Sequence, residues 1–429
     1  MDEIKKWTVY MIFLVAGFAT GIGSIGLFPQ FWLQYGSTGL ALYLVFLVVL
    51  TYVAILETET AMKSGYYFVE LYNKVSKRPA MILAIFTVIT IFLSYYAANV
   101  MLSLLSPVLG TGTVARFIAK LIMLGIVFWV LTRAKEKTFA IMAGGAIFFF
   151  LAVVVTTIAF KVQIPGNAAF LGMAKHMLVA SHPVTMAMIK AAAEKAVYGV
   201  GLGFAFYLMI GSFLNERFNA KVIIGTGILV QLLMGLMSTV VVVYSIAPAT
   251  PGRLLEYVYG GEEGAIQLLG DLPHILSNYP LLLALMALSV FFAGITSLLP
   301  TSEVGLQIIE SVMGTGREKA AMYLTGIALL IGIFDSPPTI AEMMLKAVTA
   351  SLFFTAIFEL YPVIFSKKGK PTGVITAIAV AVTLLLIGGF YAFYRDFSSG
   401  GVYIASGVIS LLIILFGIFG DRTVSQETV

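Results

Sequence analysis

The 429-residue sequence contains no cysteine, only three histidines and few charged residues. Without cysteine the chain has neither disulfide bonds nor thiolate chemistry, although this absence does not identify a cellular compartment. The histidines, His176, His182 and His274, lack the spacing of metal ligands, so we expect no histidine metal site. No nucleophile, base and orienting residue stand out as a set, and we therefore expect that the protein is not an enzyme.

Charge is scarce because apolar residues dominate the composition. Only 11% of the residues are charged, 60% are hydrophobic and the mean hydropathy is +1.01, whereas an average soluble domain has roughly 25% charged residues. Apolar runs of about 17 to 25 residues recur along the chain, and each is long enough to cross a bilayer as a helix. We count twelve, which begin near Trp7, Leu40, Met81, Phe117, Phe139, Ala191, Val222, Leu281, Ala320, Ile340, Val374 and Val402. The sequence therefore predicts an all-α integral membrane protein with twelve transmembrane helices.

Basic residues concentrate in alternate loops. The loops after the even-numbered runs, together with Lys5, Lys6 and Arg422, contain 17 of the 26 lysines and arginines. The positive-inside rule assigns these loops and both termini to the cytoplasm of a multi-pass protein in the plasma membrane. Topology explains the basic runs, so we expect contact with membrane lipid and no nucleic-acid partner. Two long segments fall on the other side, residues 161–190 and 248–280, and their apolar periodicity predicts short helices.

The first run contains "GFATGIGSIGLFP", in which Gly21, Gly23 and Gly26 have the G-x-G-x-x-G spacing of a dinucleotide-binding loop. That loop needs a preceding strand and an acidic residue about twenty positions further on, whereas here an apolar run precedes and the next acid is Glu57. Close helix packing through Gly17 and Gly21 is a second interpretation. A third is a helix that stops and restarts within the membrane, where free carbonyls bind a cation and free amides bind an anion.

The sixth run is interrupted in the same way, by "YGVGLGF" at 198–204. Each glycine costs a helix interior about 1 kcal/mol relative to alanine, so both stretches predict broken helices. Broken helices at corresponding positions of two five-helix halves are typical of transporters with inverted repeats. We expect one domain over residues 1–429, with repeat one at about 7–160, repeat two at about 191–366 and two additional helices at about 372–420.

A series of motifs in the same order resembles the neurotransmitter:sodium symporter family, whose members have the LeuT fold. The series comprises "GFATGIGSIGLFP" in the first run, "YGSTG" and "ETAMKSG" at the ends of the second, "SYYAANV" in the third, "GLGFAF" in the sixth, "FFAGITS" in the eighth and "FELYP" in the tenth. It covers most of the chain. The sequence is identified as resembling a divergent, prokaryotic-type member of this family.

The resemblance implies a sodium site between the first and eighth runs. Its ligands would be the carbonyl oxygens of Gly17, Thr20 and Ala293 and the hydroxyl oxygens of Thr296 and Ser297. The alternative role of the two hydroxyls is to bond back to carbonyls one turn earlier in their own helix.

The resemblance also implies a substrate site at the two breaks. Tyr96 and the amides around Gly23 and Ser24 would bind the substrate carboxylate. Carbonyl oxygens of the sixth run would accept hydrogen bonds from its amine. The implied positions are Ala19, Gly23, Ser24, Phe92, Tyr96, Tyr198, Gly199, Gly201, Phe204, Ser297 and Thr301. For any one of the aromatic residues, packing in the core is an equally good interpretation.

The sequence departs from the family at a second sodium site. Ser24 replaces an asparagine, Gly199 replaces a threonine, and the asparagine of the seventh run falls near Gln231 or Leu232. We therefore expect one main sodium site. Chloride dependence is not expected, because Lys195 stands where the family has a chloride-site glutamine.

The outer gate differs as well. Leu27 and Met344 replace the family's arginine and aspartate, so both charges are absent. Lys195 and Glu342 are a possible replacement pair. Alternatively, Glu342 pairs with Lys346 at i,i+4 on its own helix.

Together these features predict a sodium-coupled secondary active symporter of an amino acid or a related small amine, working by alternating access. Two alternatives remain: a proton-coupled amino-acid transporter of the same fold, and a membrane sensor that binds a ligand without transporting it. The sequence identifies neither the substrate nor the oligomeric state.

Overall fold

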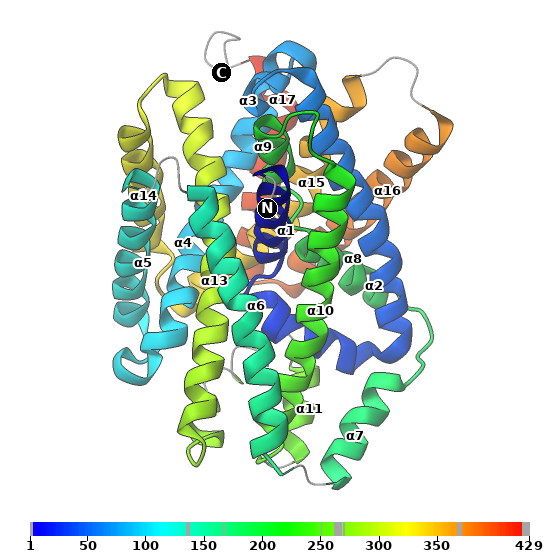
Figure 1. Ribbon diagram of the computed structural model, residues 1–429, viewed down its shortest axis with the longest axis vertical. Helices are drawn as coiled ribbons and strands as arrows, with labels where there is room; N and C mark the ends of the chain where they lie inside the picture. The colour runs from blue at the N-terminus through cyan, green and yellow to red at the C-terminus, as the bar shows by residue number, and fades with distance from the viewer. Residues whose placement is uncertain are drawn as a thin grey trace.

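The computed structural model describes residues 3–133, 138–165, 168–249, 251–260, 268, 271–366 and 371–422. These residues form helices and no strand, and most helices run along the longest axis of the molecule (Figure 1). Nine of the described helices are long and apolar enough to cross a membrane. This is the all-α membrane architecture that the composition predicts.

The first part of the chain forms α1 (Glu3–Ala19), α2 (Ile22–Ser64), α3 (Phe68–Glu70), a π-helical turn (Leu71–Val75), α4 (Pro79–Leu109), α5 (Thr113–Arg133), α6 (Thr138–Gln163) and α7 (Ala168–Val179). The second part forms α8 (Met186–Val200), α9 (Phe206–Phe213), α10 (Ala220–Ile246), α11 (Pro251–Tyr259), α13 (Pro280–Met313), α14 (Arg317–Phe334) and α15 (Pro338–Phe365). Two further helices follow, α16 (Thr372–Ser399) and α17 (Val402–Phe419), and a 3-10 turn (Gly420–Arg422) ends the described chain.

Helix is present at all twelve predicted positions, and the first and sixth runs are broken as predicted. The first run covers α1 and the start of α2, separated at Thr20 and Gly21. The sixth run covers α8 and α9, separated at 201–205. The second run continues α2 beyond Gly36, whose φ of 58° and ψ of −150° bend the chain within one continuous element. A positive φ is readily accessible only to glycine, which is why the bend occurs there.

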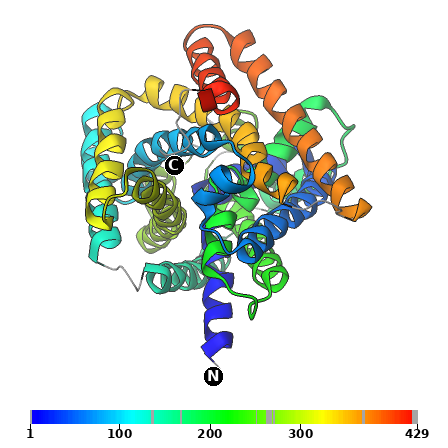
Figure 2. The same ribbon diagram turned by 90° about the horizontal axis from the view of Figure 1, so that it is seen from above.

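The helices form two groups. In one, α1, α2, α8, α9 and α10 pack on one another, and in the other, α4, α5, α13 and α14 do so. Helix α6 contacts both α1 and α13, so it bridges the groups. Seen from above, α5 and α14 lie at one edge of the molecule, whereas α16 and α17 lie at another (Figure 2).

Helices α7 and α11 confirm the short helices predicted between the long runs, and they lie at the end of the molecule opposite to α3 (Figure 1). Both are hydrogen-bonded to α2. Trp32 Nε1 donates to Leu178 O at 3.1 Å, and Gln30 Nε2 donates to Tyr257 O at 2.6 Å. The Tyr257 hydroxyl in turn donates to Gly26 O. The start of α2 is therefore held by both short helices.

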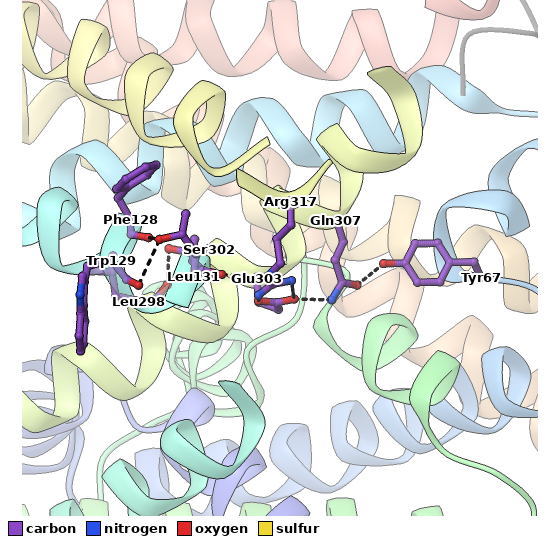
Figure 3. A network of polar contacts seen from close by, with 10 residues as sticks. Tyr67, Phe128, Trp129, Leu131, Leu298, Ser302, Glu303, Gln307 and Arg317 are labelled. Carbon is purple, nitrogen blue, oxygen red and sulfur yellow. Dashed lines mark hydrogen bonds and ion pairs between the residues drawn. The ribbon is translucent and has the colours of Figure 1, made fainter. Parts of the chain in front are cut away.

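A polar network crosses the other end of the bundle (Figure 3). Arg317 binds both carboxylate oxygens of Glu303 at 2.8 and 2.6 Å and donates to Leu131 O at 2.8 Å. Gln307 donates to Glu303 at 2.7 Å and accepts from the Tyr67 hydroxyl. The network joins α5, α13 and α14 to the connection between α2 and α4.

We predict that Gly211→Ala lowers the thermal stability of the purified protein. A Cβ at this position of α9 would overlap Thr58 O and lie 2.8 Å from Ala61 Cβ, both on α2. Because the backbone cannot move aside as a flexible side chain does, we expect the free energy of unfolding to fall by about 1–3 kcal/mol. The measurement is the apparent Tm in detergent.

The matched control is Gly225→Ala in α10, where a Cβ would meet nothing within 4 Å. Alanine in an open helical position stabilises by about 1 kcal/mol at most. Equal Tm values for the two variants would contradict the close α2 to α9 contact.

Candidate functional site

The two helix breaks face one cavity of about 620 Å³. Its wall contains residues of α1, α2, α4, α5, α8, α10, α13 and α15 and of both breaks. A volume of this size lies within the range of about 300–1,000 Å³ that is typical of small-molecule sites.

The cavity brings together ten of the eleven residues that the resemblance assigns to the substrate. They are Ala19, Gly23, Phe92, Tyr96, Tyr198, Gly199, Gly201, Phe204, Ser297 and Thr301. The side chain of the eleventh, Ser24, lies outside the described part of the chain. Gln231 also lines the cavity, whereas Leu232 does not, so Gln231 is the seventh-run residue at this site.

The first break places polar groups of three helices close together. A Cβ at Gly21 would lie 2.7 Å from the Tyr96 hydroxyl and 3.3 Å from Ser297 Oγ, so only glycine leaves room for them. Helix α2 begins at the next residue, and no side chain caps its N-terminus at Gly21. The free amides of a helix start attract an anion, and the Tyr96 hydroxyl is a further donor beside them.

The second break contains three residues in left-handed conformation, with φ values of 82° at Gly201, 95° at Gly203 and 57° at Ala205. The amide of Gly203 donates to Glu359 Oε2 of α15 at 2.5 Å. A Cβ at Gly201 would overlap the ring of Phe18, so the break and this ring fit only because residue 201 is glycine.

Aromatic rings form much of the cavity wall. The rings of Phe92 and Tyr96 stack with centroids 4.6 Å apart, and Phe204 lies 4.9 Å from Phe92. The Tyr198 hydroxyl lies 2.7 Å from Thr349 Oγ1, which fixes its orientation toward α15. Phe92 thus contacts both Tyr96 and Phe204, whereas Tyr198 is oriented by α15.

Four of the five oxygen atoms expected to bind sodium, all except the Thr20 carbonyl oxygen, lie together between α1 and α13. Ser297 Oγ is 2.9 Å from Phe18 O and 3.4 Å from both Gly17 O and Ala293 O. Thr296 Oγ1 is 3.1 Å from Ala293 O and also bonds to a carbonyl one turn earlier. The back-bonding alternative is therefore present, and Ser297 in addition reaches across to α1.

The surroundings of this oxygen cluster are close-packed. A Cβ at Gly17 would lie 2.6 Å from Ala146 Cβ of α6, which shows how closely α1 approaches its neighbours. The Thr20 side chain turns away, and its hydroxyl donates to Ala16 O at 2.6 Å. Neutral carbonyl and hydroxyl oxygens at an unwound helix are the donor set that suits a monovalent cation.

The proposed gate residues do not form an ion pair with each other in this structure. Lys195 lines the cavity but pairs with its neighbour Glu194 at 3.0 Å. Glu342 pairs with Lys346 at 3.4 Å and accepts from the Tyr403 hydroxyl at 2.9 Å. This arrangement corresponds to the i,i+4 alternative, and a Lys195 to Glu342 gate stays a prediction for another conformation.

Two buried carboxylates beside the second break were not among the residues predicted from the sequence. Glu359 binds the Gly203 amide, and Glu57 of α2 lies next to it. Both are 0% exposed, and the Glu57 oxygens meet no hydrogen-bond donor among the described residues. The sequence does contain one indication of them: each is an acidic residue within an apolar run, and such residues are functional candidates by default.

We predict that Glu359→Ala destabilises the protein by about 1–3 kcal/mol, because it leaves the buried Gly203 amide without an acceptor. The measurement is again the apparent Tm. Glu70→Ala is the matched control, since Glu70 is a half-exposed acid whose pair with Lys74 at 3.3 Å lies on the surface. Such surface pairs contribute roughly 0–1 kcal/mol to stability. A fall in Tm for the Glu70 variant as large as that for the Glu359 variant would refute the capping role of Glu359.

Comparison with known proteins supports the architecture. The sequence matches no protein-family model and no curated protein. Among solved structures, it is similar to the crystal structure of MhsT in complex with L-phenylalanine, with a TM-score of 0.62 and 15% sequence identity. The similarity covers 97% of this chain and 96% of that chain. The chain therefore shares the LeuT fold of MhsT over almost its whole length.

Proposed function

We propose that the protein is a sodium-coupled secondary active symporter of an amino acid or a related small amine, and a divergent member of the neurotransmitter:sodium symporter family. One observation carries the proposal. The first helix break, the Tyr96 hydroxyl and the oxygen cluster around Ser297 converge beside a single cavity. The fold shared with MhsT, whose structure contains L-phenylalanine, supports an amino acid as the substrate.

In this proposal the substrate carboxylate binds the amides of Gly23 and Ser24 and the hydroxyl of Tyr96. Its amine donates to carbonyl oxygens of the second break, near Tyr198 and Gly199. The substrate side chain lies among the cavity residues Phe92, Phe204 and Thr301, with Ala19, Gly201 and Ser297 completing the wall. The space beside Gly199 and Gly201 is taken by the Tyr43 hydroxyl and the Phe18 ring, so these glycines do not by themselves enlarge the pocket.

Sodium would bind between α1 and α13, at the carbonyls of Gly17, Thr20 and Ala293 and the hydroxyls of Thr296 and Ser297. A cation there joins the broken first helix to the other helix group. It would thereby link ion binding to the movement of one group against the other that alternating access requires. We propose no role for chloride, because Lys195 stands where the family has a chloride-site glutamine.

A proton-coupled transporter of the same fold is the second candidate. The observation that favours it is the buried pair Glu57 and Glu359, which lies beside the second break and has no ion pair with a described cation. Two adjacent carboxyl groups in a dry site favour holding a proton between them. Uptake that is independent of sodium and driven by a proton gradient would support this candidate.

The first test is a ligand screen on the purified protein. We expect one or more of the twenty amino acids or simple amines to raise the apparent Tm in sodium buffer, and to do so less in potassium buffer. The same ligand should accumulate in proteoliposomes with a sodium gradient. Binding without uptake would indicate a sensor, and no response to any ligand would refute the proposal.

Ser297→Ala should raise the sodium concentration for half-maximal uptake by about tenfold or more, the effect of about 1.4 kcal/mol of lost cation binding. Ser302→Ala is the matched control, because Ser302 is a buried serine of α13 that donates only to Leu298 O within its own helix. Unchanged sodium dependence in the Ser297 variant would exclude this hydroxyl as a ligand.

With one working sodium site, we expect a sodium-to-substrate flux ratio of one. Each sodium ion contributes about 2.3 kcal/mol per 100 mV, so a single ion gives a correspondingly modest concentration gradient. The measurement is the uptake of labelled sodium and labelled substrate into the same proteoliposomes. A ratio of two would show that Ser24, Gly199 and Gln231 still permit a second site.

A further inference from the structure

The cavity wall is cationic. Arg116 of α5 and Lys195 of α8 are the charged residues among the described residues that line it, and neither aspartate nor glutamate belongs to that set. A cavity within the membrane concentrates the field of such charges, because the surrounding dielectric constant is low. The wall therefore favours an anionic ligand over a cationic one.

Arg116 is held in place by α4 rather than by an ion pair. Its Nη2 donates to Asn99 Oδ1 at 3.3 Å, and its guanidinium lies 6.0 Å from the centre of the Tyr95 ring. Both partners are on α4 and also line the cavity. The Nε atom is buried without a hydrogen-bond partner, and Arg116 forms no ion pair with a described carboxylate.

The nearest carboxylate is already used. Asp335, at the end of α14, binds the ammonium group of Lys120, one turn along α5, and accepts from Ser94 at 3.1 Å. All three of these residues are completely buried. Asp335 also attracts Arg116 electrostatically, but its ion pair is with Lys120. The two cations thus share one carboxylate, and Arg116 has no ion pair of its own.

Lys195, the other cation of the wall, has a partner, because Glu194 forms ion pairs with both Lys190 and Lys195. Arg116 is therefore the cation of the described wall that forms no ion pair with a described carboxylate. A buried charge without a matching partner is costly. A ligand that brings a negative charge into the cavity removes that cost, whereas a neutral ligand does not.

The position of Arg116 suits the second acid group of a bound amino acid. Tyr96 and Asn99 are three residues apart on α4 and so lie on the same face, about one turn of helix apart. Tyr96 contacts the first break, and Asn99 binds Arg116. One turn rises about 5 Å, which is comparable to the separation of the two carboxylates in an acidic amino acid.

We propose that the substrate is an acidic amino acid, whose α-carboxylate binds at the first helix break and whose side-chain carboxylate is received by Arg116. The side chain of such a substrate extends along α4 from Tyr96 toward Asn99, away from Phe92, and so takes a different direction from a neutral side chain among Phe92, Phe204 and Thr301. This inference rests on the proposed function and specifies its substrate class. The planar guanidinium fork binds a carboxylate through two parallel hydrogen bonds. Asn99 is a positioning residue that orients the fork, and Lys195 adds to the attraction without contacting the side chain.

The test compares isosteric pairs on the full-length wild-type protein in sodium buffer. L-glutamate and L-aspartate should give half-maximal thermal shifts at concentrations at least about tenfold lower than L-glutamine and L-asparagine. A hydrogen-bonded charge pair supplies enough free energy for this preference, since every 1.4 kcal/mol changes affinity tenfold. The same order should hold for inhibition of uptake in proteoliposomes.

Arg116→Gln should abolish the preference for the acidic member of each pair. Arg133→Gln is the matched control, because Arg133 is an exposed arginine at the other end of α5. It should keep the wild-type preference. If the Arg116 variant does not fold, the comparison of ligands on the wild-type protein remains decisive.

The outcomes separate this inference from the proposed function. Sodium-dependent binding of neutral amino acids, with no preference for acidic ones, would overturn the inference and leave the symporter proposal intact. Retention of an acidic preference by Arg116→Gln would overturn the role of this residue. No sodium-dependent response to any amino acid would overturn both.

Discussion

A bilayer offers no hydrogen-bond partners to a polypeptide backbone, and the structure depends on how the chain meets this constraint at two places. In most helices the backbone amides and carbonyls hydrogen-bond to one another, but α1 and α8 end within the bundle. At the second break, the Glu359 carboxylate accepts from Gly203. At the first break, α2 begins without a side-chain cap, so its amides remain available to a ligand. The backbone groups that the fold leaves free are those that give the cavity its chemistry.

The glycines at the breaks act through the space they leave as much as through their flexibility. Gly21 admits the Tyr96 hydroxyl and Ser297 Oγ to the break, and Gly201 admits the ring of Phe18. Aromatic rings and hydroxyls can thus approach the main chain closely and cover part of the broken segments. A helix interruption in a membrane is stable only if neighbouring side chains take over this shielding, and here three different helices provide it.

Much of this architecture is visible in the sequence because its signals are local. Apolar length predicts helices, and clustered glycines predict breaks, so both were found at the expected positions. Pairings between distant helices were harder to predict, since they depend on how each helix is rotated about its axis. Nothing in the sequence around Arg116 indicates that Asn99 would be its partner. Likewise, Lys195 binds its sequence neighbour Glu194 rather than Glu342, because the short-range partner is always within reach.

The hydrogen bonds between α11 and α2 have a mechanical consequence. Tyr257 donates to Gly26 O and accepts from Gln30, so the short helix is clamped over the first turns of α2. Those turns begin at the break whose amides face the cavity. Any displacement of the break would therefore be transmitted through these hydrogen bonds to α11, at the far end of the molecule.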